Sequence, residues 1–569
     1  MLQAEARAAA TPIERPRAAV DRSRIDAAGR LEPGSLDALL DQAVARFPTQ
    51  RFLEFQGKVW TFEQVGHLVE RAAAGFQKLG VGPGVKVGLF LPNCPYFVIG
   101  FFAVLKAGGT VVSYNPLYAD REIEHQIDNS ETEIIVTLDL AALLPKLQPM
   151  LGRTRLRAIV VARFADLLPF PKSFLFPWLK RREMADVPDQ RGYVWFNDLL
   201  ADHVPAHRPA PDRTAEIAVL QYTGGTTGVA KGAVLTHANL LANAAQLAGW
   251  YREARPGGER VLAVLPLFHV FALTVAMLYS VRMGAELILV PRFDLTQLLG
   301  TITRKRPTIL PGVPTLFAAI NNHPALARYD LSSIRLCISG GAPLPREVQD
   351  TFEARTGCQM VEGYGLTESL IVSCNPIGGP RKAGSIGLPL PGTIIEIVSP
   401  ADRTTVLPSG ETGEICVRGP QRMAGYWNRP DETAKVLVDD RLHTGDLGYL
   451  DEDGYGFVVD RLKELILCSG FNVYPRVVEE AIYRHPVVLE AAVVGVPDDY
   501  RGETVKAYVV PSAGNSLTAS ELLAFLKDQL SPIEMPKLIE FRSALPKSTI
   551  GKILKRELRR QHLEGTGQA

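Results

Sequence analysis

Short apolar runs alternate with segments of helical spacing over much of the chain. A continuous apolar run between turn residues is typical of a buried strand, and apolar residues three to four positions apart are typical of a helix facing a core. The runs that predict strands are residues 85–91, 110–112, 134–136, 261–265, 287–290, 308–310 and 334–338. Because strands that alternate with helices form largely parallel sheets, this pattern predicts two α/β layers.

The pattern changes after about residue 385. Short alternating runs at 393–398 and 413–417 are separated by Gly and Pro, which predicts a small β-rich subdomain. From Asp460 onward the chain is long enough to fold separately as a small α+β unit. Within it, Thr518 and Glu521 form a capping box before a predicted helix.

These patterns predict an α/β protein with a large N-terminal domain and a small C-terminal domain. The large domain combines two α/β layered subdomains with the β-rich subdomain, and the small one is an α+β lid. The expected boundaries are a disordered tail at 1–30, the large domain at 31–459 and the lid at 460–569.

Composition excludes several classes of function. With 569 residues the chain is too long for a single core. Its 62 basic and 61 acidic residues leave a net charge of +1, which offers no electrostatic footprint for nucleic acid. The six cysteines include no Cys-x-x-Cys pair, which indicates neither a zinc site nor a disulfide framework and fits a reducing cytoplasm. No run reaches the ~18 apolar residues of a membrane-spanning helix.

The segment 221–232 predicts a loop that binds phosphate. It contains four glycines, three threonines and Lys231, so it offers close backbone approach, hydroxyl donors and a positive charge. An apolar run precedes it and a helical pattern begins at Thr236, which predicts the order strand, loop, helix that cradles anions. Lys231 lies between Ala230 and Gly232, so this is not a Walker A loop. A flexible turn between two core elements is the alternative.

The whole string, from Tyr222 to Gly232, resembles the phosphate loop of the adenylate-forming enzymes, which include acyl-CoA synthetases, luciferases and peptide-synthetase adenylation domains. It is most similar to the long-chain fatty-acid:CoA ligases. Gly224 stands where many relatives carry Ser, and Ala230 where they carry Pro; both look like features of the long-chain branch. The resemblance implies that ATP phosphates bind to the following residues, with Thr223 also catalytic: Thr223, Gly224, Gly225, Thr226, Thr227, Gly228 and Lys231.

A second motif, residues 362–369, resembles the family segment that binds adenine, phosphate and metal. By itself it is also compatible with a capped turn. The resemblance implies that Tyr364 and Gly365 contact adenine, that Thr367 contacts the α-phosphate and that Glu368 holds Mg²⁺. A carboxylate suits a hard cation on phosphate oxygens. The family's adenine-side loop matches a segment in which small side chains leave room for a flat base: Gly340, Gly341 and Ala342.

The third and fourth motifs are weak alone, because Gly-Asp turns and charged turns are common. By resemblance, Asp446 in Thr444-Gly445-Asp446 accepts both ribose hydroxyls, and Arg461 also contacts the ribose. Lys463 matches the pivot between the large domain and the lid. Gly470 begins a segment that borders the channel for the pantetheine arm of coenzyme A.

Lys552 matches the family's catalytic lysine. It follows Gly551 in a turn near the end of the chain, whereas Lys547 and Lys555 are interpreted as part of a solvated basic face. A carboxylate that attacks a phosphate brings negative charges together, so a bridging cation stabilises the transition state.

His269 lies where an apolar helix is expected to begin. A structural role is one interpretation of a lone histidine, and the resemblance offers another, a catalytic place beside the acyl carboxylate. Phe268, Phe271 and Leu273 would then form part of an apolar wall around the acyl chain.

The segment 164–195 breaks the α/β pattern, because aromatic residues run straight into a basic cluster at 180–182. It is interpreted either as an insertion that packs on its own domain or as an interfacial anchor. In the second case Phe174 and Trp178 would enter the lipid and the basic residues would meet anionic headgroups.

The resemblance runs from about Leu39 to Leu558 and implies a two-step ligation. A fatty acid and Mg·ATP would give an acyl-adenylate and pyrophosphate, and the thiol of coenzyme A would then displace AMP after the lid rotates. A fatty acyl-AMP ligase and a coumarate-type or luciferase-type enzyme remain alternatives. A membrane-associated fatty-acid binding or transport protein is another class, against which Lys552, Glu368 and Asp446 argue. No carrier domain follows the lid, so use in a fused peptide synthetase is not expected. Monomer and homodimer are both left open.

Overall fold

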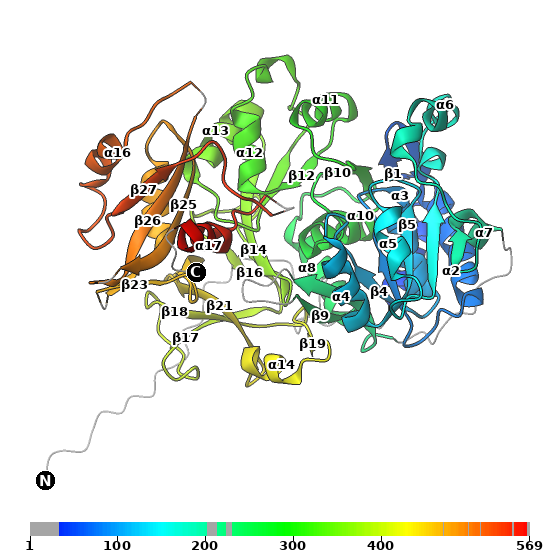
Figure 1. Ribbon diagram of the computed structural model, residues 1–569, viewed down its shortest axis with the longest axis horizontal. Coiled ribbons are helices and arrows are strands. Elements are labelled where there is room, and N and C mark those ends of the chain that lie inside the picture. Colours follow the sequence, from blue (N-terminus) through cyan, green and yellow to red (C-terminus); the bar gives the residue numbers. More distant parts are fainter. Residues whose placement is uncertain are drawn as a thin grey trace, which may run out of the picture.

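The computed structural model describes residues 34–201, 213–223, 230–469, 471–498, 500–512, 514–548 and 551–565. The predicted tail at 1–30 lies outside them. The described chain forms four sheets, of which two are large and mainly parallel (Figure 1).

The first large sheet has the strand order β19-β9-β8-β4-β3-β5-β6-β7. Its six strands from β8 to β7 in this order are parallel, whereas β9 and β19 are antiparallel to their neighbours. The strands are β3 (Lys86–Leu89), β4 (Thr110–Ser113), β5 (Thr132–Leu138), β6 (Ala158–Ala162), β7 (Tyr193–Trp195), β8 (Ile217–Thr223), β9 (Lys231–Thr236) and β19 (Gly425–Tyr426).

The second large sheet has the order β16-β15-β14-β13-β12-β10-β11-β1-β2 and is parallel from β14 to β1. The strands are β1 (Arg51–Phe55), β2 (Lys58–Thr61), β10 (Arg260–Ala263), β11 (Glu286–Leu289), β12 (Ile309–Gly312), β13 (Leu336–Ser339), β14 (Gln359–Leu366), β15 (Leu370–Cys374) and β16 (Leu388–Pro389). The two α/β layers predicted from the apolar pattern are therefore present.

The helices of these layers begin at residues that the sequence marks by capping side chains and by the spacing of apolar residues. Thr61 and Thr236, for example, form capping boxes before α2 and α8. The helices are α1 (Leu36–Arg46), α2 (Phe62–Lys78), α3 (Pro95–Lys106), α4 (Asp120–Ser130), α5 (Leu144–Leu147), α6 (Lys172–Leu179), α7 (Phe196–Leu200), α8 (His237–Trp250), α9 (Val270–Ala272), the π-helix η5 (Leu273–Leu278), α10 (Tyr279–Met283), α11 (Leu295–Lys305), α12 (Pro314–Asn321) and α13 (Arg346–Thr356).

One local prediction is wrong. The phosphate-loop segment does not lead directly into a helix, because β9 follows it and pairs antiparallel with β8 from Thr223↔Lys231 to Ile217↔Thr236. The helix α8 begins only after this strand, at His237. The loop therefore closes a hairpin, and the N-terminus of α8 lies a strand length away from it.

The β-rich subdomain is a third, mainly antiparallel sheet at the bottom of Figure 1. Its elements are β17 (Ile394–Val398), β18 (Gly413–Arg418), α14 (Pro430–Val436), β20 (Leu437–Val438), β21 (Arg441–Leu450) and β22 (Gly456–Arg461). A register shift in the β18–β21 pairing lies between Glu414 and Cys416, opposite residues 443–447. This bulge shapes the turn that carries Asp446.

The lid forms the fourth sheet, at the left of Figure 1. Its apolar core, on both faces of the β25–β26 pair, is separate from the core of the larger part. The predicted capping box of Thr518 and Glu521 is present at α16. The elements are β23 (Ile466–Cys468), β24 (Phe471–Val473), α15 (Pro475–Tyr483), β25 (Val488–Asp498), β26 (Gly502–Pro511), α16 (Ala519–Leu526), β27 (Leu538–Phe541) and α17 (Lys555–Gly565).

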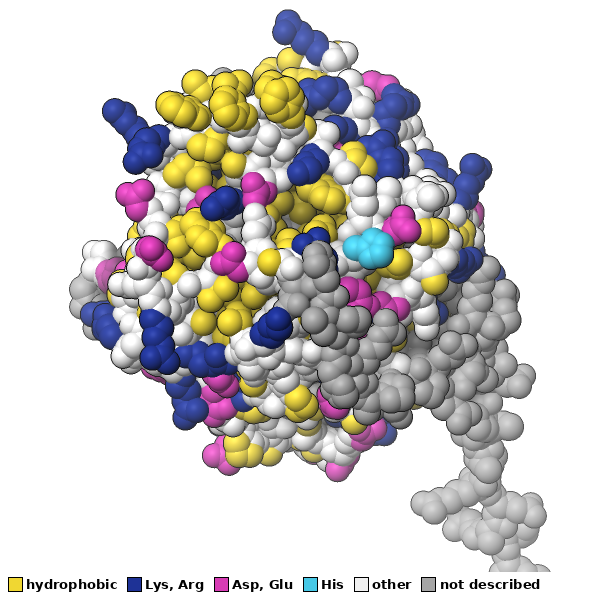
Figure 2. Space-filling view, turned by 90° about the vertical axis from the view of Figure 1, so that its right-hand side faces the viewer, with side chains coloured by type: hydrophobic (Ala, Val, Ile, Leu, Met, Phe, Trp, Pro, Cys, Tyr) yellow, Lys and Arg dark blue, Asp and Glu magenta, His cyan; other side chains and the backbone are white. Residues whose placement is uncertain are grey.

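The segment around α6 stands out from the surface. Of its aromatic residues, Phe176 packs against Phe164 at a ring distance of 4.9 Å, but α6 has no buried residue. Its other large apolar side chains form an exposed group at the top of Figure 2, with Lys and Arg side chains beside it. These are Phe170, Phe174, Leu175, Trp178 and Leu179, with exposures from 42% to 85%. None of the described helices is both long and apolar enough to span a bilayer.

Candidate functional site

Three predicted ribose and adenine residues meet where β14, β21 and β22 come together. The Tyr364 hydroxyl donates to Asp446 Oδ2 at 2.7 Å, and Arg461 Nε lies 3.0 Å from Asp446 Oδ1. Burial, and then the Asp446 charge, raise the pKa of Tyr364 well above its usual value, so this hydroxyl remains a hydrogen-bond donor. Both Asp446 oxygens thus have partners that fix the carboxylate before any nucleotide binds.

The turn that presents Asp446 is held by Glu414, which the sequence analysis did not single out. Glu414 Oε1 accepts the Gly445 N–H at 3.0 Å, and its Oε2 lies 2.7 Å from His443 Nδ1. Thr444 Oγ1 donates to Ile415 O at 2.7 Å and accepts the Asp446 N–H. Gly445 has a φ of +74°, which favours glycine at this bend.

Cys416 lies beside this pair, and its Sγ is 3.4 Å from His443 Nδ1. Glu414, Cys416 and His443 are all buried and close enough to suggest a metal centre. Two ligands of one tetrahedral zinc ion would stand about 3.3 Å apart, given metal–ligand distances of about 2.0 Å. The 2.7 Å separation of Glu414 and His443 is instead that of a hydrogen bond.

The predicted hinge is bonded directly to the segment of β21 that carries Asp446. The Leu462 N–H donates to Gly445 O at 2.9 Å, and Lys463 follows Leu462 in the turn after β22. Gly470, predicted to border the coenzyme A channel, lies outside the described residues.

The predicted phosphate end of the site is built from β8, β9 and the turn after β14. Thr223 ends β8 and Lys231 begins β9. Lys231 forms an ion pair with Glu432 of α14, and its Nζ lies 5.1 Å from the centroid of the Tyr426 ring. The predicted phosphate-binding residues between the two strands lie outside the described residues: Gly224, Gly225, Thr226, Thr227 and Gly228.

Glu368, the predicted metal ligand, follows Thr367 in the turn between β14 and β15. Its Oε1 accepts a hydrogen bond from the Tyr426 hydroxyl at 2.7 Å. Glu368 is only partly buried, and a carboxylate held by one oxygen keeps lone pairs for a hard cation. The donor chemistry therefore fits Mg²⁺. Gly365 is required nearby, since a Cβ there would stand 2.0 Å from Leu370 O.

The predicted adenine-side loop, Gly340, Gly341 and Ala342, follows β13. A Cβ at Gly340 would lie 3.2 Å from the Phe271 ring and from Gly363 O, and Gly341 has a φ of +79°. The loop is thus kept open by glycine. Phe271 packs against it from below the surface of the site.

Two of the three predicted acyl-wall residues are buried. Leu273 has no exposed surface and Phe271 retains 7%, whereas Phe268 is half-buried. Leu273 begins the π-helix η5, a rare geometry that is frequent at functional sites.

His269 caps α9, the short helix that runs directly into η5. Its Nδ1 accepts the Phe271 N–H at 3.3 Å, which is the structural role weighed for it. Burial, and then the Lys552 charge, lower the pKa of His269 to about 4, so the ring is neutral at physiological pH. The capping role and a place near Lys552 are therefore compatible.

Lys552 reaches the site from the lid. Thr315 Oγ1, in α12, donates to Gly551 O at 3.4 Å, and Gly551 has a φ of +80°. Burial and the Arg461 charge lower the pKa of Lys552 to about 8, while Glu464 and Asp446 oppose this shift. Lys552 is therefore within electrostatic range of both the ribose end and His269.

Several of these groups keep accessible surface although protein surrounds them. Tyr364, His269 and Lys552 are each partly exposed, yet burial is the largest cause of the pKa shift of each. Residues that line a cleft keep some accessible surface while little bulk water surrounds them, so we infer that these three residues line one cleft.

One prediction for the lysines of this segment is wrong. Lys555 is not on a solvated face, because its Nζ lies 2.8 Å from Glu479 and 3.4 Å from Glu464, and these acids raise its pKa. Both partners are distant in sequence, so the basic run gave no sign of them. Lys547 pairs with Glu490.

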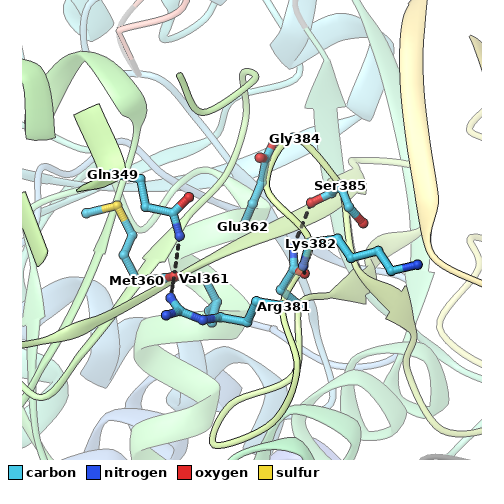
Figure 3. A pocket seen from close by; sticks show the side chains of 9 residues that line it. Gln349, Met360, Val361, Glu362, Arg381, Lys382, Gly384 and Ser385 are labelled. Carbon is cyan, nitrogen blue, oxygen red and sulfur yellow. Dashed lines mark hydrogen bonds between the residues drawn. The ribbon is translucent and has the colours of Figure 1, made fainter. Parts of the chain in front are cut away.

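Two hollows lie outside this cleft. One, of about 10 Å³, is the size of a single water molecule; beside it Gln349 and Arg381 both donate to Met360 O (Figure 3). Burial raises the pKa of Glu362, which lines it, to about 7, against the opposing charge of Arg476. The other is a surface groove of about 470 Å³ that Tyr426, Trp427 and Thr433 help to line.

Comparison with known proteins agrees with this geometry. The AMP-binding enzyme model matches residues 40–427, and the model of the AMP-binding enzyme C-terminal domain matches residues 477–552. The chain belongs to the AMP-binding enzyme family. The resemblance and the fold class inferred from the sequence are thereby confirmed.

Individual relatives give a more specific comparison than the family models. The chain is 44% identical over 534 residues to a long-chain-fatty-acid–CoA ligase of Bacillus subtilis, covering 93% of this chain and 95% of the relative. It is 40% identical over 554 residues to the ligase of that name from Escherichia coli O6:H1, covering 95% and 97%. The crystal structure of the anthranilate CoA ligase AuaEII with anthranoyl-AMP superposes with a TM-score of 0.83 at 26% identity, covering 95% of this chain and 99% of that one.

Proposed function

We propose that this enzyme joins a long-chain fatty acid to coenzyme A in two steps that share one cleft. In the first, a carboxylate oxygen attacks the α-phosphorus of ATP; an acyl–phosphate bond forms and the α–β anhydride bond breaks, which releases pyrophosphate. In the second, the thiol of coenzyme A attacks the acyl carbon and AMP leaves. The names of the 44% and 40% identical relatives support this substrate class.

The observation that carries the proposal is the approach of Lys552 to the ribose end. Asp446 and Arg461 are proposed to hold the ribose, which places the α-phosphate near the lid turn at 551–553. The Lys552 ammonium then neutralises charge that builds up between the attacking carboxylate and the phosphate. Such preorganised charge contributes to the rate because it is strongest in the transition state.

The remaining nucleotide contacts are proposed from the motifs. Residues 223–228 and Lys231 would hold the polyphosphate, and Tyr364 with the loop 340–342 would bound the adenine. Glu368 would hold Mg²⁺, which supplies positive charge to the phosphate oxygens. His269, neutral at physiological pH, would lie beside the acyl carboxylate as an uncharged neighbour.

The second step requires the lid to move. We propose the domain limits 31–459 and 460–569, with rotation about Lys463 that breaks the Thr315–Gly551 contact and withdraws Lys552. The segment that begins at Gly470 would then border the coenzyme A channel.

The exposed group on α6 is proposed to contact a membrane surface. Phe174 and Trp178 are 66% and 79% exposed and stand beside Lys180, Arg181 and Arg182. Apolar tips next to cations fit an interface with anionic headgroups. In sedimentation with anionic vesicles, the Phe174→Ala/Trp178→Ala variant should stay in solution where the wild type pellets. Equal partitioning would remove this part of the proposal.

The ligation itself is tested with purified protein, ATP, coenzyme A and acids from acetate to oleate. The expected result is AMP and acyl-CoA in equal amounts, with the longer chains favoured. Accumulation of acyl-AMP without thioester would indicate an acyl-AMP ligase, and a preference for aryl acids would indicate a coumarate-type enzyme. Binding of acids without AMP formation would indicate a transport protein and overturn the proposal.

A further inference from the structure

We propose that Tyr426 is a positioning residue that fixes the Glu368 carboxylate through its hydroxyl and the Lys231 ammonium through its ring, so that both face Mg·ATP. This inference rests on the proposed function, in which Glu368 meets the metal and Lys231 meets phosphate. Nothing in the sequence motifs singles out Tyr426, which lies 58 positions after Glu368.

The hydroxyl end of Tyr426 controls Glu368. The 2.7 Å hydrogen bond from Tyr426 Oη to Glu368 Oε1 joins a neutral donor to a charged acceptor, a class about twice as strong as a neutral pair. Burial and the neighbouring Glu368 raise the pKa of Tyr426 far above its usual value, so the hydroxyl keeps its proton. One carboxylate oxygen is thereby held while the other is left for a cation.

The ring of Tyr426 controls Lys231. The Lys231 Nζ lies 5.1 Å from the ring centroid, within the range of a cation–π contact, and the same ammonium pairs with Glu432. Glu432 is also paired with Lys435 at 2.5 Å. Lys231 is thus held between an aromatic face and an acid that is already partly neutralised, an arrangement in which phosphate can replace Glu432 as its partner.

Backbone hydrogen bonds connect the segment around Tyr426 both to Glu368 and to the strand that begins at Lys231. The Met423 N–H donates to Glu368 O at 2.8 Å, and the Trp427 N–H donates to Gly232 O at 2.8 Å. Tyr426 itself pairs with Ala233 across β19 and β9, and its N–H donates to Thr433 Oγ1 at 2.9 Å. The position of the side chain is therefore set by the fold and does not depend on a bound ligand.

Without the hydroxyl, only the metal ligand would be released. Glu368 would lose its fixed oxygen, whereas the aromatic face would still hold Lys231. The expected defect is therefore specific to the metal–nucleotide complex. A role in folding alone would weaken every ligand or none.

The test compares Tyr426→Phe, which removes only the hydroxyl, with Tyr426→Leu, which also removes the aromatic face. Tyr455→Phe is the matched control, since its hydroxyl donates to Pro380 O at the same 2.7 Å but contacts none of the site residues. Calorimetry measures the Kd for Mg·ATP and, in EDTA, for metal-free ATP, and thermal melting reports folding.

Tyr426→Phe is expected to raise the Kd for Mg·ATP about tenfold and to leave that for metal-free ATP within about twofold, which matches the loss of one hydrogen bond to a charged group. Tyr426→Leu is expected to weaken both complexes, and Tyr455→Phe neither. An equal effect of Tyr426→Phe on both ligands, or no effect, would overturn the inference. Failure of the wild type to bind Mg·ATP would instead overturn the proposed function.

Discussion

The ribose end and the phosphate end of the cleft are organised differently. At the ribose end, Asp446 already accepts a hydrogen bond from Tyr364 of β14 and forms an ion pair with Arg461, which lies on the strand β22 next to its own. At the phosphate end, Lys231 is paired with Glu432, and Lys552 arrives from the lid with a lowered pKa. Under the proposed function, the nucleoside half is complete in advance, whereas the phosphate half exchanges partners on binding. This difference would assign recognition to one end and catalysis to the other.

The largest expected effect is at the phosphate end. Lys552→Ala should slow adenylate formation by about a thousandfold, since removal of one contact to transition-state charge typically costs that much. Conversion of supplied acyl-AMP and coenzyme A to thioester should remain within a few fold of wild type. Pyrophosphate exchange and thioester release measure the two half-reactions. Lys547→Ala is the control, and an equal loss in both half-reactions would contradict the division of labour.

At the ribose end, Glu414→Ala should act on binding. It leaves the Gly445 N–H without its acceptor and loosens the turn that presents Asp446. The Gly445 N–H is part-buried, so leaving it unsatisfied should cost about 1–2 kcal/mol, and the KM for ATP should rise roughly five- to thirtyfold while the KM for fatty acid changes little. The preference for ATP over 2′-deoxy-ATP should also shrink.

The control for this experiment is Glu414→Gln, in which a carbonyl oxygen still accepts from Gly445. If Glu414→Ala raises both Michaelis constants together, the effect is one of general stability and the link to the ribose end is broken.

The lowered pKa of Lys552 predicts the pH dependence of the first step. Lys552 is charged below its pKa of about 8 in the free enzyme and loses its proton above it. The kcat/KM for adenylation should therefore fall as pH rises through about 8, by up to tenfold per unit, because this parameter reports the free enzyme. Lys552→Arg should move this fall in kcat/KM to higher pH. A flat profile between pH 7 and 9 would show that Lys552 is not the titrating group.

The smallest effect on activity is expected at Glu362. This residue belongs neither to the ribose end nor to the phosphate end, and it lines the small cavity shown in Figure 3. Its pKa of about 7 in the folded protein exceeds the usual 4.5, so the folded state binds this proton more tightly. Stability should therefore fall as pH rises from 4.5 through 7 and stay low above 7.

Glu362→Gln removes the loss of stability at high pH, because the amide does not titrate. It should stabilise the protein at pH 8, by at most ~3 kcal/mol, and change little at pH 4.5. Denaturant unfolding at the two pH values measures this difference. A gain of the same size at both would show that the carboxyl does not titrate in this range.

Local patterns in the sequence were enough to predict the parallel sheets and the motif order, because apolar period and capping residues act over a few positions. The capping box at Thr518 and Glu521 is an example. It was harder to predict which strands pair with each other. Residues 231–236 had an apolar character compatible with several elements, and only the pairing with β8 makes them a strand.

Side-chain partners distant in the chain could not be predicted in this way. Tyr426 meets Glu368, and Lys555 meets Glu479 and Glu464, only because separate elements converge. The sequence of the strand that contains Glu414 alternates between polar and apolar residues. Glu414 therefore has the pattern of an ordinary polar position in a strand, and nothing marks it as part of a site. The motif residues were found because a resemblance supplied their roles, whereas the residues that hold them carried no such signal.

The position of α6 bears on how catalysis would proceed at a lipid boundary. In Figure 1, α6 and the lid lie at opposite ends of the long axis of the molecule. A protein tethered through Trp178 and its neighbours would keep its moving part out in the water. Each turnover would then proceed without detachment of the protein from the lipid.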